Sequence, residues 1–186
     1  MSLSVPAHTS SRSSAAWWEE TRGNPERLVA WLFEQYRGEV TAAERIERLR
    51  DTYATPGGRA WRVLSVIADQ ERLHAGWVAA LLRTRGLVPE VRGEPERRYW
   101  ARTLPGISDL ETGCAVGAHA EHMRLERIEV IAADTTAPAD LRDVFARILP
   151  QERFHERAFR SLATPESLER TREAHNLGRA VLGLTP

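Results

Sequence analysis

The pentapeptide QERLH at residues 70–74 returns near the C-terminus as QERFH at residues 151–155. Each copy places a glutamate three positions before a histidine, a spacing that puts both side chains on one face of an α-helix. Apolar residues recur at intervals of three and four around each motif, so each pair lies within an apolar stripe. The stripes contain Leu64, Ile67, Val78 and Leu81 around the first motif, and Leu141, Phe145, Ile148, Phe159 and Leu162 around the second.

Each motif is preceded by a segment that carries a lone glutamate on an apolar face. The first glutamate is Glu39, with Leu28, Leu32, Ala42 and Ile46, and the second is Glu121, with Cys114, Ala118, Leu125 and Ile128. The two halves of the chain therefore repeat one pattern: a glutamate on one helix, then a Glu-x-x-His motif on the next. A single Glu-x-x-His pair is a weak signal, but this repeated arrangement predicts a cluster inside a helical bundle.

Capping residues and helix breakers delimit the helices. Asn24 before Pro25 indicates a helix start, Gly86 a helix end, and Ser108 with Glu111 a capping box. We expect long helices at about residues 25–53, 59–85, 108–134 and 138–163, and a shorter one at 165–183. The connection 87–107 contains three prolines and is long enough to cross a bundle. These features predict an all-α, ferritin-like four-helix bundle with one long crossover between helices 2 and 3 and a short C-terminal helix, although helix lengths and breaks alone would also suit other all-helical folds.

Composition places the chain among single-domain proteins. It has 186 residues and a formal net charge of zero, which gives no electrostatic support for binding nucleic acid or anionic lipid. The lone Cys114 excludes an internal disulfide and fits the cytoplasm. No apolar run reaches the roughly 18 residues of a membrane span. We expect a flexible arm at residues 1–16 and one domain at residues 17–186.

The chemistry of the predicted cluster points to metal ions. Burying four unpaired carboxylates inside a bundle would cost several kcal/mol each. Together they would offset a typical domain's whole free energy of folding. Two divalent cations would balance their charge, and the two neutral imidazoles would complete the ligand set. Mixed carboxylate and imidazole ligation suits iron or manganese and does not forbid zinc. The predicted metal ligands are Glu39, Glu71, His74, Glu121, Glu152 and His155.

These six residues resemble the ligand motifs of the ferritin-like di-iron superfamily, which includes rubrerythrins, bacterioferritins, ferritins and di-iron oxygenases. The resemblance covers residues 25–163. It implies two iron ions, with Mn/Fe or Mn as alternatives. It also implies the roles of the ligands: one ion on Glu39 and His74, the other on Glu121 and His155, with bridges from Glu71 and Glu152.

The sequence departs from the rubrerythrin pattern in two ways. It has no cysteine-rich electron-donor domain, and the positions three residues from Glu121 are Ala118 and Arg124 instead of a further glutamate. These departures argue against a rubrerythrin-like peroxidase activity. His119 and His122 flank Glu121 but point about 100° away on a helix, so we expect interface or surface positions for them.

Several nearby residues are read as packing residues. Tyr36, one turn before Glu39, and Cys114 are predicted core residues, with a redox role as the less favoured interpretation. Trp31, Trp61 and Trp77 are predicted to pack at helix interfaces.

The resemblance predicts a cytoplasmic oxidoreductase that activates dioxygen or peroxide to oxidise or hydroxylate a small molecule. Electrons would come from an external donor such as a ferredoxin or a reductase, or from the substrate, and a homodimer is allowed. A ferroxidase or iron-storage protein and a non-catalytic metal-stabilised scaffold are the alternatives. A tRNA-modifying hydroxylase has analogues in the superfamily, but the chain has no basic stripe to support it.

Overall fold

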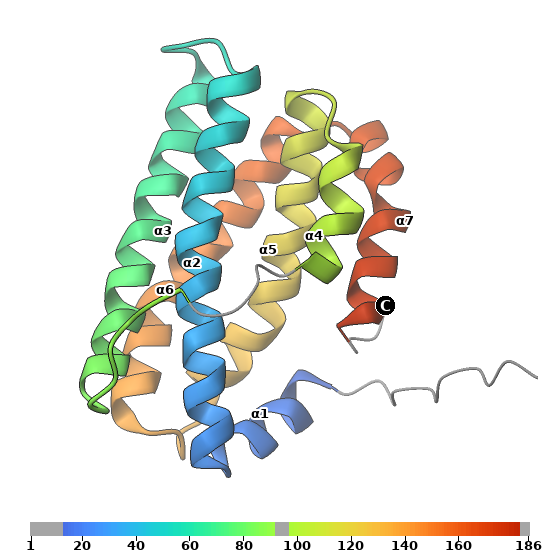
Figure 1. Cartoon of the computed structure of the whole chain (residues 1–186). Helices are drawn as coiled ribbons and strands as arrows, with labels where there is room; N and C mark the ends of the chain where they lie inside the picture. The colour runs from blue at the N-terminus through green and yellow to red at the C-terminus, as the bar shows by residue number, and fades with distance from the viewer. Residues whose placement is uncertain (1–12, 92–96, 183–186) are drawn as a thin grey trace, which may run out of the picture.

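Four long antiparallel helices form the body of the protein (Figure 1). The computed structural model describes residues 13–91 and 97–182. The long helices are α2 (Pro25–Tyr53), α3 (Arg59–Arg83), α5 (Leu110–Ala133) and α6 (Ala139–Leu162). Shorter elements are α1 (Ser14–Arg22), α4 (Arg97–Thr103), the 3-10 turn η1 (Leu104–Gly106) and α7 (Pro165–Val181). The predicted all-α bundle is confirmed, and its two hairpins are α2 with α3 and α5 with α6.

Local capping explains most helix ends. The Asn24 side chain accepts hydrogen bonds from the backbone N–H of Glu26 and Arg27 at the start of α2. Gly86 has φ of +73°, as predicted for the residue that ends α3. The predicted Ser108 capping box is wrong by one position, because the Asp109 carboxylate accepts the Thr112 N–H at 2.7 Å and Thr112 closes the box.

The N-terminal part of the chain differs in detail from the sequence-based expectation. Helix α1 begins at Ser14, inside the predicted arm 1–16, because Ser13 caps the Ala16 N–H and Trp18 is buried. The Trp18 indole donates a 2.8 Å hydrogen bond to Asp134, which ties α1 to the end of α5. Residues 1–12 lie outside the described residues.

The predicted crossover between α3 and α5 contains the short helix α4. Its Tyr99 is fully buried, and its hydroxyl makes a 2.8 Å hydrogen bond with His175 of α7. Helix α7 packs against both α4 and α5 (Figure 1). The described part of the crossover from residue 97 onward is therefore packed on the fold through α4, which its prolines and charges did not indicate.

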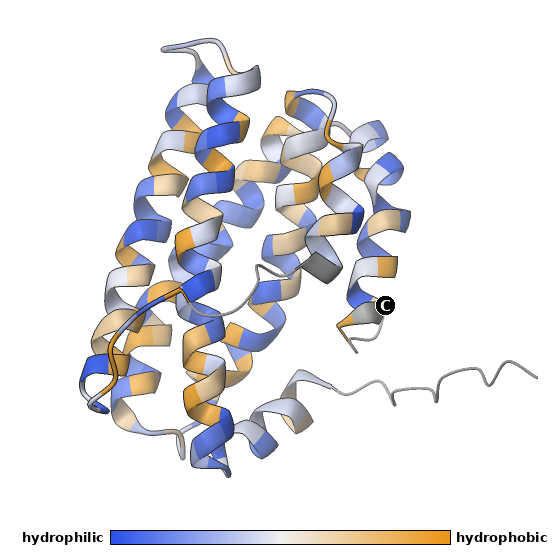
Figure 2. Ribbon diagram, viewed as in Figure 1, coloured by the Kyte–Doolittle hydropathy of each residue, from blue (hydrophilic) through white to orange (hydrophobic). Residues whose placement is uncertain are grey.

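The core consists of two apolar clusters. One contains Trp31, Leu82, Ile131 and Phe145, and the other contains Ile46, Leu64, Ile67 and Phe159. Apolar and polar residues alternate along the helices (Figure 2), as expected when each helix buries one stripe. No helix of the described ranges combines the length and apolar character needed to cross a membrane.

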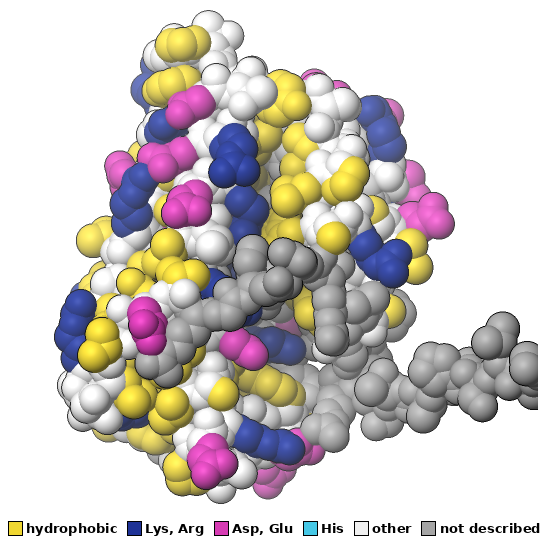
Figure 3. Space-filling model, in the orientation of Figure 1, with side chains coloured by type: hydrophobic (Ala, Val, Ile, Leu, Met, Phe, Trp, Pro, Cys, Tyr) yellow, Lys and Arg dark blue, Asp and Glu magenta, His cyan; other side chains and the backbone are white. Residues whose placement is uncertain are grey.

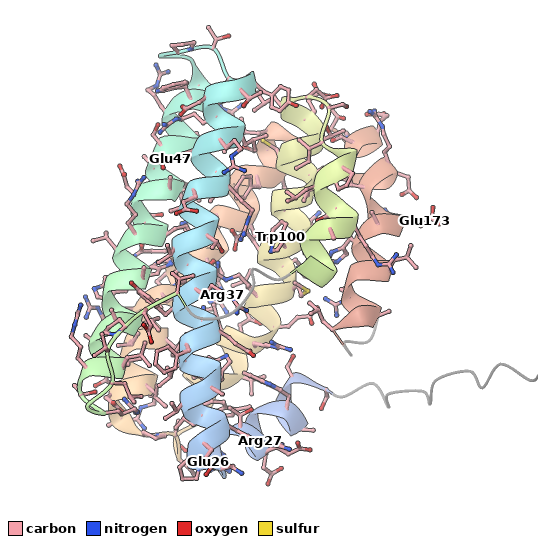
Figure 4. All side chains as sticks on the ribbon, in the orientation of Figure 1. Glu26, Arg27, Arg37, Glu47, Trp100 and Glu173 are labelled. Atoms are coloured by element: carbon pink, nitrogen blue, oxygen red, sulfur yellow. The ribbon has the colours of Figure 1, made fainter. Side chains whose placement is uncertain are left out.

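Helices α2 and α5 leave a cavity between them. Its volume is about 390 Å³, and residues of α2, α4, η1 and α5 supply most of its lining. Figure 3 shows apolar side chains gathered in the groove on this face of the molecule. In Figure 4, Trp100 of α4 lies beside the same groove, where its ring stacks against the guanidinium of Arg45 at 3.9 Å. The bundle is thus closed on the α3 and α6 side and hollow on the α2 and α5 side.

Candidate metal centre

The six predicted ligands converge at one buried point in the bundle. Their ligand atoms form two groups, and within each group all atoms lie within 4.8 Å of one another. Five of the six side chains are fully buried, and the sixth, Glu121, is 4% exposed. The first group is Glu39, Glu71, His74 and Glu152, and the second is Glu71, Glu121, Glu152 and His155.

Glu71 and Glu152 belong to both groups, which is the arrangement needed for two bridging carboxylates. Glu39 and His74 are specific to the first group, and Glu121 and His155 to the second. Each helix of the bundle contributes at least one of these residues because its apolar stripe turns that position inward. The sequence pattern therefore located the cluster, while the roles of its members as metal ligands stay a prediction.

Both histidines turn Nδ1 toward the carboxylates. Nδ1 of His74 lies 3.3 Å from Glu152 Oε1 and 3.6 Å from Glu39 Oε2. Nδ1 of His155 lies 3.2 Å from Glu71 Oε1 and 3.5 Å from Glu152 Oε2. A neutral imidazole in this orientation could offer the Nδ1 lone pair to a cation held by the same carboxylates.

Two glutamines fix the histidine rings from the opposite side. His155 Nε2 lies 2.8 Å from Gln70 Oε1, and His74 Nε2 lies 3.1 Å from Gln151 Oε1. Because an amide oxygen only accepts hydrogen bonds, Nε2–H must be the donor, which leaves Nδ1 for the centre. Each QE-x-x-H motif therefore orients the histidine of the other motif. Our sequence reasoning did not assign these glutamines a role, although their repetition in both motifs was a usable signal.

Arg124 also reaches the centre, and sequence reasoning missed it. Its Nη2 lies 2.5 Å from Glu39 Oε2 and 3.2 Å from Glu152 Oε1, and its Nη1 donates to Glu71 Oε2 at 3.3 Å. The residue lies one turn after Glu121, where the sequence showed only a departure from the rubrerythrin pattern. A cationic side chain within an apolar stripe next to a predicted ligand was the signal available.

The surroundings set the carboxylate pKa values far apart. Burial raises the pKa of Glu71 to about 7, in spite of the nearby Arg124 guanidinium. Burial acts in the same direction on Glu39, but the Arg124 guanidinium and the close approach of His74 outweigh it and lower its pKa to about 2. Burial and the charges of Glu152 and Glu71 raise the pKa of Glu121 well above its usual range.

The histidine pKa values rise because carboxylates surround the rings. Burial alone would lower the pKa of His74, but Glu152 and Glu39 raise it to about 10. The pKa of His155 is raised by Glu152 and Glu71 against the same effect of burial. Protons on these groups, together with Arg124, can balance the carboxylate charge, and a metal ion would have to replace such protons.

The donor set fits a pair of divalent cations. Buried atoms without a hydrogen-bond partner include Oε1 of Glu71, Oε2 of Glu121 and Nδ1 of both histidines. Buried polar atoms are normally paired, so unpaired oxygens and nitrogens that point to one place indicate a missing cationic partner. Two shared carboxylates, two terminal carboxylates and two imidazoles are the ligand types that ferritin-like di-metal bundles provide.

The cavity between α2 and α5 ends at this centre. Glu121, Arg124 and Gln35 line its inner wall, and Gln35 donates a 2.6 Å hydrogen bond to Glu39. Gly117 on α5 lets the Phe159 ring pack close to the helix backbone at the cavity wall, because an added Cβ there would lie 2.8 Å from the ring. Most of the remaining wall is apolar, with Ile46, Leu49, Val116, Ile128 and Ile131 among its members.

The other candidates from the sequence lie outside the centre. His119 Nε2 contacts the Leu168 carbonyl at 3.1 Å and its ring stacks on His175, so it joins α5 to α7. His122 is 56% exposed and lies near Glu156. Both positions agree with the expectation that they are interface and surface groups.

The residues interpreted as packing groups also lie in packed surroundings. Tyr36 packs against the first apolar cluster, and Cys114 is buried in the second, where burial raises its thiol pKa to about 12. Trp31 packs on Phe145 and also lines the cavity, which we did not expect. Arg50 stacks on Trp61, and Arg147 stacks on Trp77.

The fold and the buried cluster together define a ferritin-like helical bundle with a carboxylate and histidine centre. The sequence profile of the rubrerythrin family matches residues 32–163. The chain belongs to the rubrerythrin family, within the ferritin-like di-iron superfamily.

Comparison with solved structures agrees with this class. One similar structure is protein 43 with aldehyde deformylating oxygenase activity from Synechococcus, with a TM-score of 0.73 and 22% sequence identity. The alignment covers 97% of this chain and 90% of the Synechococcus chain. At this identity the likeness supports the fold alone. The comparison with curated proteins found no match.

Proposed function

We propose that the protein is a di-iron oxidoreductase that uses dioxygen or peroxide to oxidise or hydroxylate a small molecule. The observation that carries the proposal is a cluster of two ligand groups, sharing Glu71 and Glu152, at the inner end of an apolar cavity. A pair of iron ions bound there would supply the electrons that reduce dioxygen or peroxide. The similar Synechococcus protein has aldehyde deformylating oxygenase activity, which supports an oxygen-using reaction.

The side chains of this chain would each have a defined task. Glu39 and His74 would hold one ion and Glu121 and His155 the other. The glutamines on the two QE-x-x-H motifs would keep the imidazole rings in the correct tautomer. The apolar cavity would bind the substrate beside Glu121 and exclude water from the reacting groups.

The cavity favours an enzyme over a metal-stabilised scaffold. A scaffold needs no internal space, yet the walls here are mostly apolar and reach a ligand residue. We propose that electrons come from an external donor, such as a ferredoxin or a reductase, or from the substrate. We propose a cytoplasmic location, with iron as the metal ahead of Mn/Fe or Mn.

Reconstitution with iron tests the proposal. The protein would be stripped of metal, loaded with ferrous iron without air, and mixed with oxygenated buffer while absorbance and oxygen consumption are followed. We expect two equivalents of iron per chain and transient absorption when oxygen is admitted. Stoichiometric zinc in the purified protein with no oxygen consumption would favour the scaffold, and a large shell-forming assembly would favour iron storage.

Variants of the bridging residues test the ligand assignment. Glu71→Ala and Glu152→Ala should each lose metal, because each residue belongs to both ligand groups. Glu129→Ala is the matched control: it removes a half-exposed glutamate of α5 that pairs with Arg153 outside the centre, so metal content should stay unchanged. Retention of two equivalents by either bridging variant would refute the assignment.

A further inference from the structure

We propose that Arg124 makes the two metal positions unequal, so that the Glu121 and His155 position fills first and the Glu39 and His74 position is weaker. The inference rests on the proposed di-metal function. It names Arg124 as the residue that sets metal affinity within the centre.

The guanidinium contacts the oxygens of the first ligand group. Nη2 lies 2.5 Å from Glu39 Oε2 and 3.2 Å from Glu152 Oε1. These two oxygens are also the ones that face His74 Nδ1, at 3.6 and 3.3 Å. Nη2 and a metal ion on His74 would therefore need the same oxygens.

The second ligand group uses different atoms. His155 Nδ1 faces Glu71 Oε1 at 3.2 Å and Glu152 Oε2 at 3.5 Å. Arg124 contacts the opposite oxygen of each of these carboxylates, Oε2 of Glu71 and Oε1 of Glu152. In the described part of the chain, the ionic contacts of Arg124 thus fall on the side of His74.

Two positive charges cannot share this place at low cost. A guanidinium and a divalent cation a few ångströms apart repel strongly in a partly buried setting, where water screens poorly. A metal ion on Glu39 and His74 would therefore require the guanidinium to withdraw. Only the Nη1 contact with Glu71 has hydrogen-bonding geometry, while Nη2 meets Glu39 and Glu152 without it. A metal ion, which does not need the directional geometry of a hydrogen bond, can therefore replace Nη2 at the Glu39 and Glu152 oxygens.

The cavity offers the displaced side chain a place. Arg124 lines the cavity wall, and its side chain is 21% exposed. It can therefore swing outward without unfolding α5. The Glu39 and His74 position would still bind a metal ion, but with lower affinity, because the Arg124 guanidinium must first move away from three carboxylates. Binding at the Glu121 and His155 position does not require this movement.

Metal titration of the stripped protein tests the inference without any measurement of catalysis. Cobalt(II) would be added under calorimetric and absorbance detection to wild-type protein, Arg124→Gln and Arg127→Gln. Arg127 is the matched control: it lies one turn further along α5 and lines the same cavity, but its guanidinium stacks on Trp17. We expect two steps in the wild type that differ by at least about tenfold in affinity.

Arg124→Gln should tighten the second step by at least about tenfold and lower the melting temperature of the metal-free protein. Arg127→Gln should leave both steps in place. A general packing defect in Arg124→Gln would weaken metal binding. Tighter metal binding in a protein with a lower melting temperature would therefore separate the proposed role from a structural one. Equal steps in the wild type, or a second step weakened by Arg124→Gln, would overturn the inference.

The histidines assign the steps independently of the arginine variant. His155→Ala should remove the tight step and His74→Ala the weak one. The reverse result would overturn the inference even if Arg124→Gln does not fold. Failure of the wild type to bind any metal would instead refute the proposed function.

Discussion

Replacement of Gln151 by leucine should weaken the metal position on the opposite half of the bundle. Gln151 lies on α6, next to Glu152 in sequence, yet its Oε1 contacts His74 of α3 at 3.1 Å. Leucine keeps most of the side-chain volume and removes the acceptor. The His74 ring would lose the contact that fixes its tautomer and orientation, and its Nε2–H would be left buried without a partner.

The expected loss is about 10 to 100-fold in affinity at the His74 position, or about 1.4 to 2.8 kcal/mol. The His155 position should keep its affinity within a few-fold, because Gln70 orients that ring at 2.8 Å. Gln70→Leu is the mirror variant and should weaken the His155 position while it spares the His74 position.

Calorimetric titration of both variants with cobalt(II), each combined with His74→Ala or His155→Ala, measures one position at a time. Gln151→Leu should reduce binding only where His74 is present. If Gln151→Leu instead weakened binding in the His74→Ala background, the reciprocal pairing would be refuted.

Four further predictions concern protons and packing. Metal binding needs neutral His74, whose pKa is raised to about 10, and ionised Glu71, whose pKa is raised to about 7. Binding should therefore release protons and tighten as pH rises toward 10. Calorimetry in buffers of different ionisation enthalpy measures the released protons, and a result of zero would contradict this prediction. In the metal-free protein, the raised His74 pKa should add stability that is fully present below its usual value and is lost as pH rises through about 10, measured by urea unfolding at several pH values. Phe145→Ala should lower the free energy of unfolding by about 3 to 5 kcal/mol in urea, because the ring is fully buried. Tyr99→Phe should lower it by about 1 to 2 kcal/mol, because His175 loses its buried hydrogen-bond partner. A loss below about 0.5 kcal/mol, the level of an exposed substitution, would contradict either prediction.

The sequence was sufficient to predict the bundle because its decisive features are local. Helical periodicity, Asn24 and Gly86 act within a few residues, and they located the long helices and most of their ends. The capping box of α5 was misplaced because Ser108 and Asp109 are both good caps, and only the observed hydrogen bonds select Asp109.

Features that depend on contacts between distant segments were harder to predict. The repeated Glu-x-x-His spacing predicted that six residues meet at one point, and the structure places them there. The spacing gives no sign that the Arg124 side chain also contacts the cluster. Helix α4 has seven residues and packs through Tyr99 against α7, a contact that no local pattern encodes. The cavity likewise depends on the spacing of α2 and α5, whose residues supply most of its lining.

The one-sided cavity has a kinetic consequence for the centre. Five of the six clustered side chains are fully buried, and the sixth, Glu121, lies on the cavity wall, so in the described part of the chain the cavity connects the centre with its surroundings. A molecule seated there should slow the escape of bound metal to a chelator, even when it does not change the equilibrium affinity. Chelator chase with and without a cavity-filling apolar compound would detect such trapping, and equal release rates would show that the centre communicates with solvent by another path.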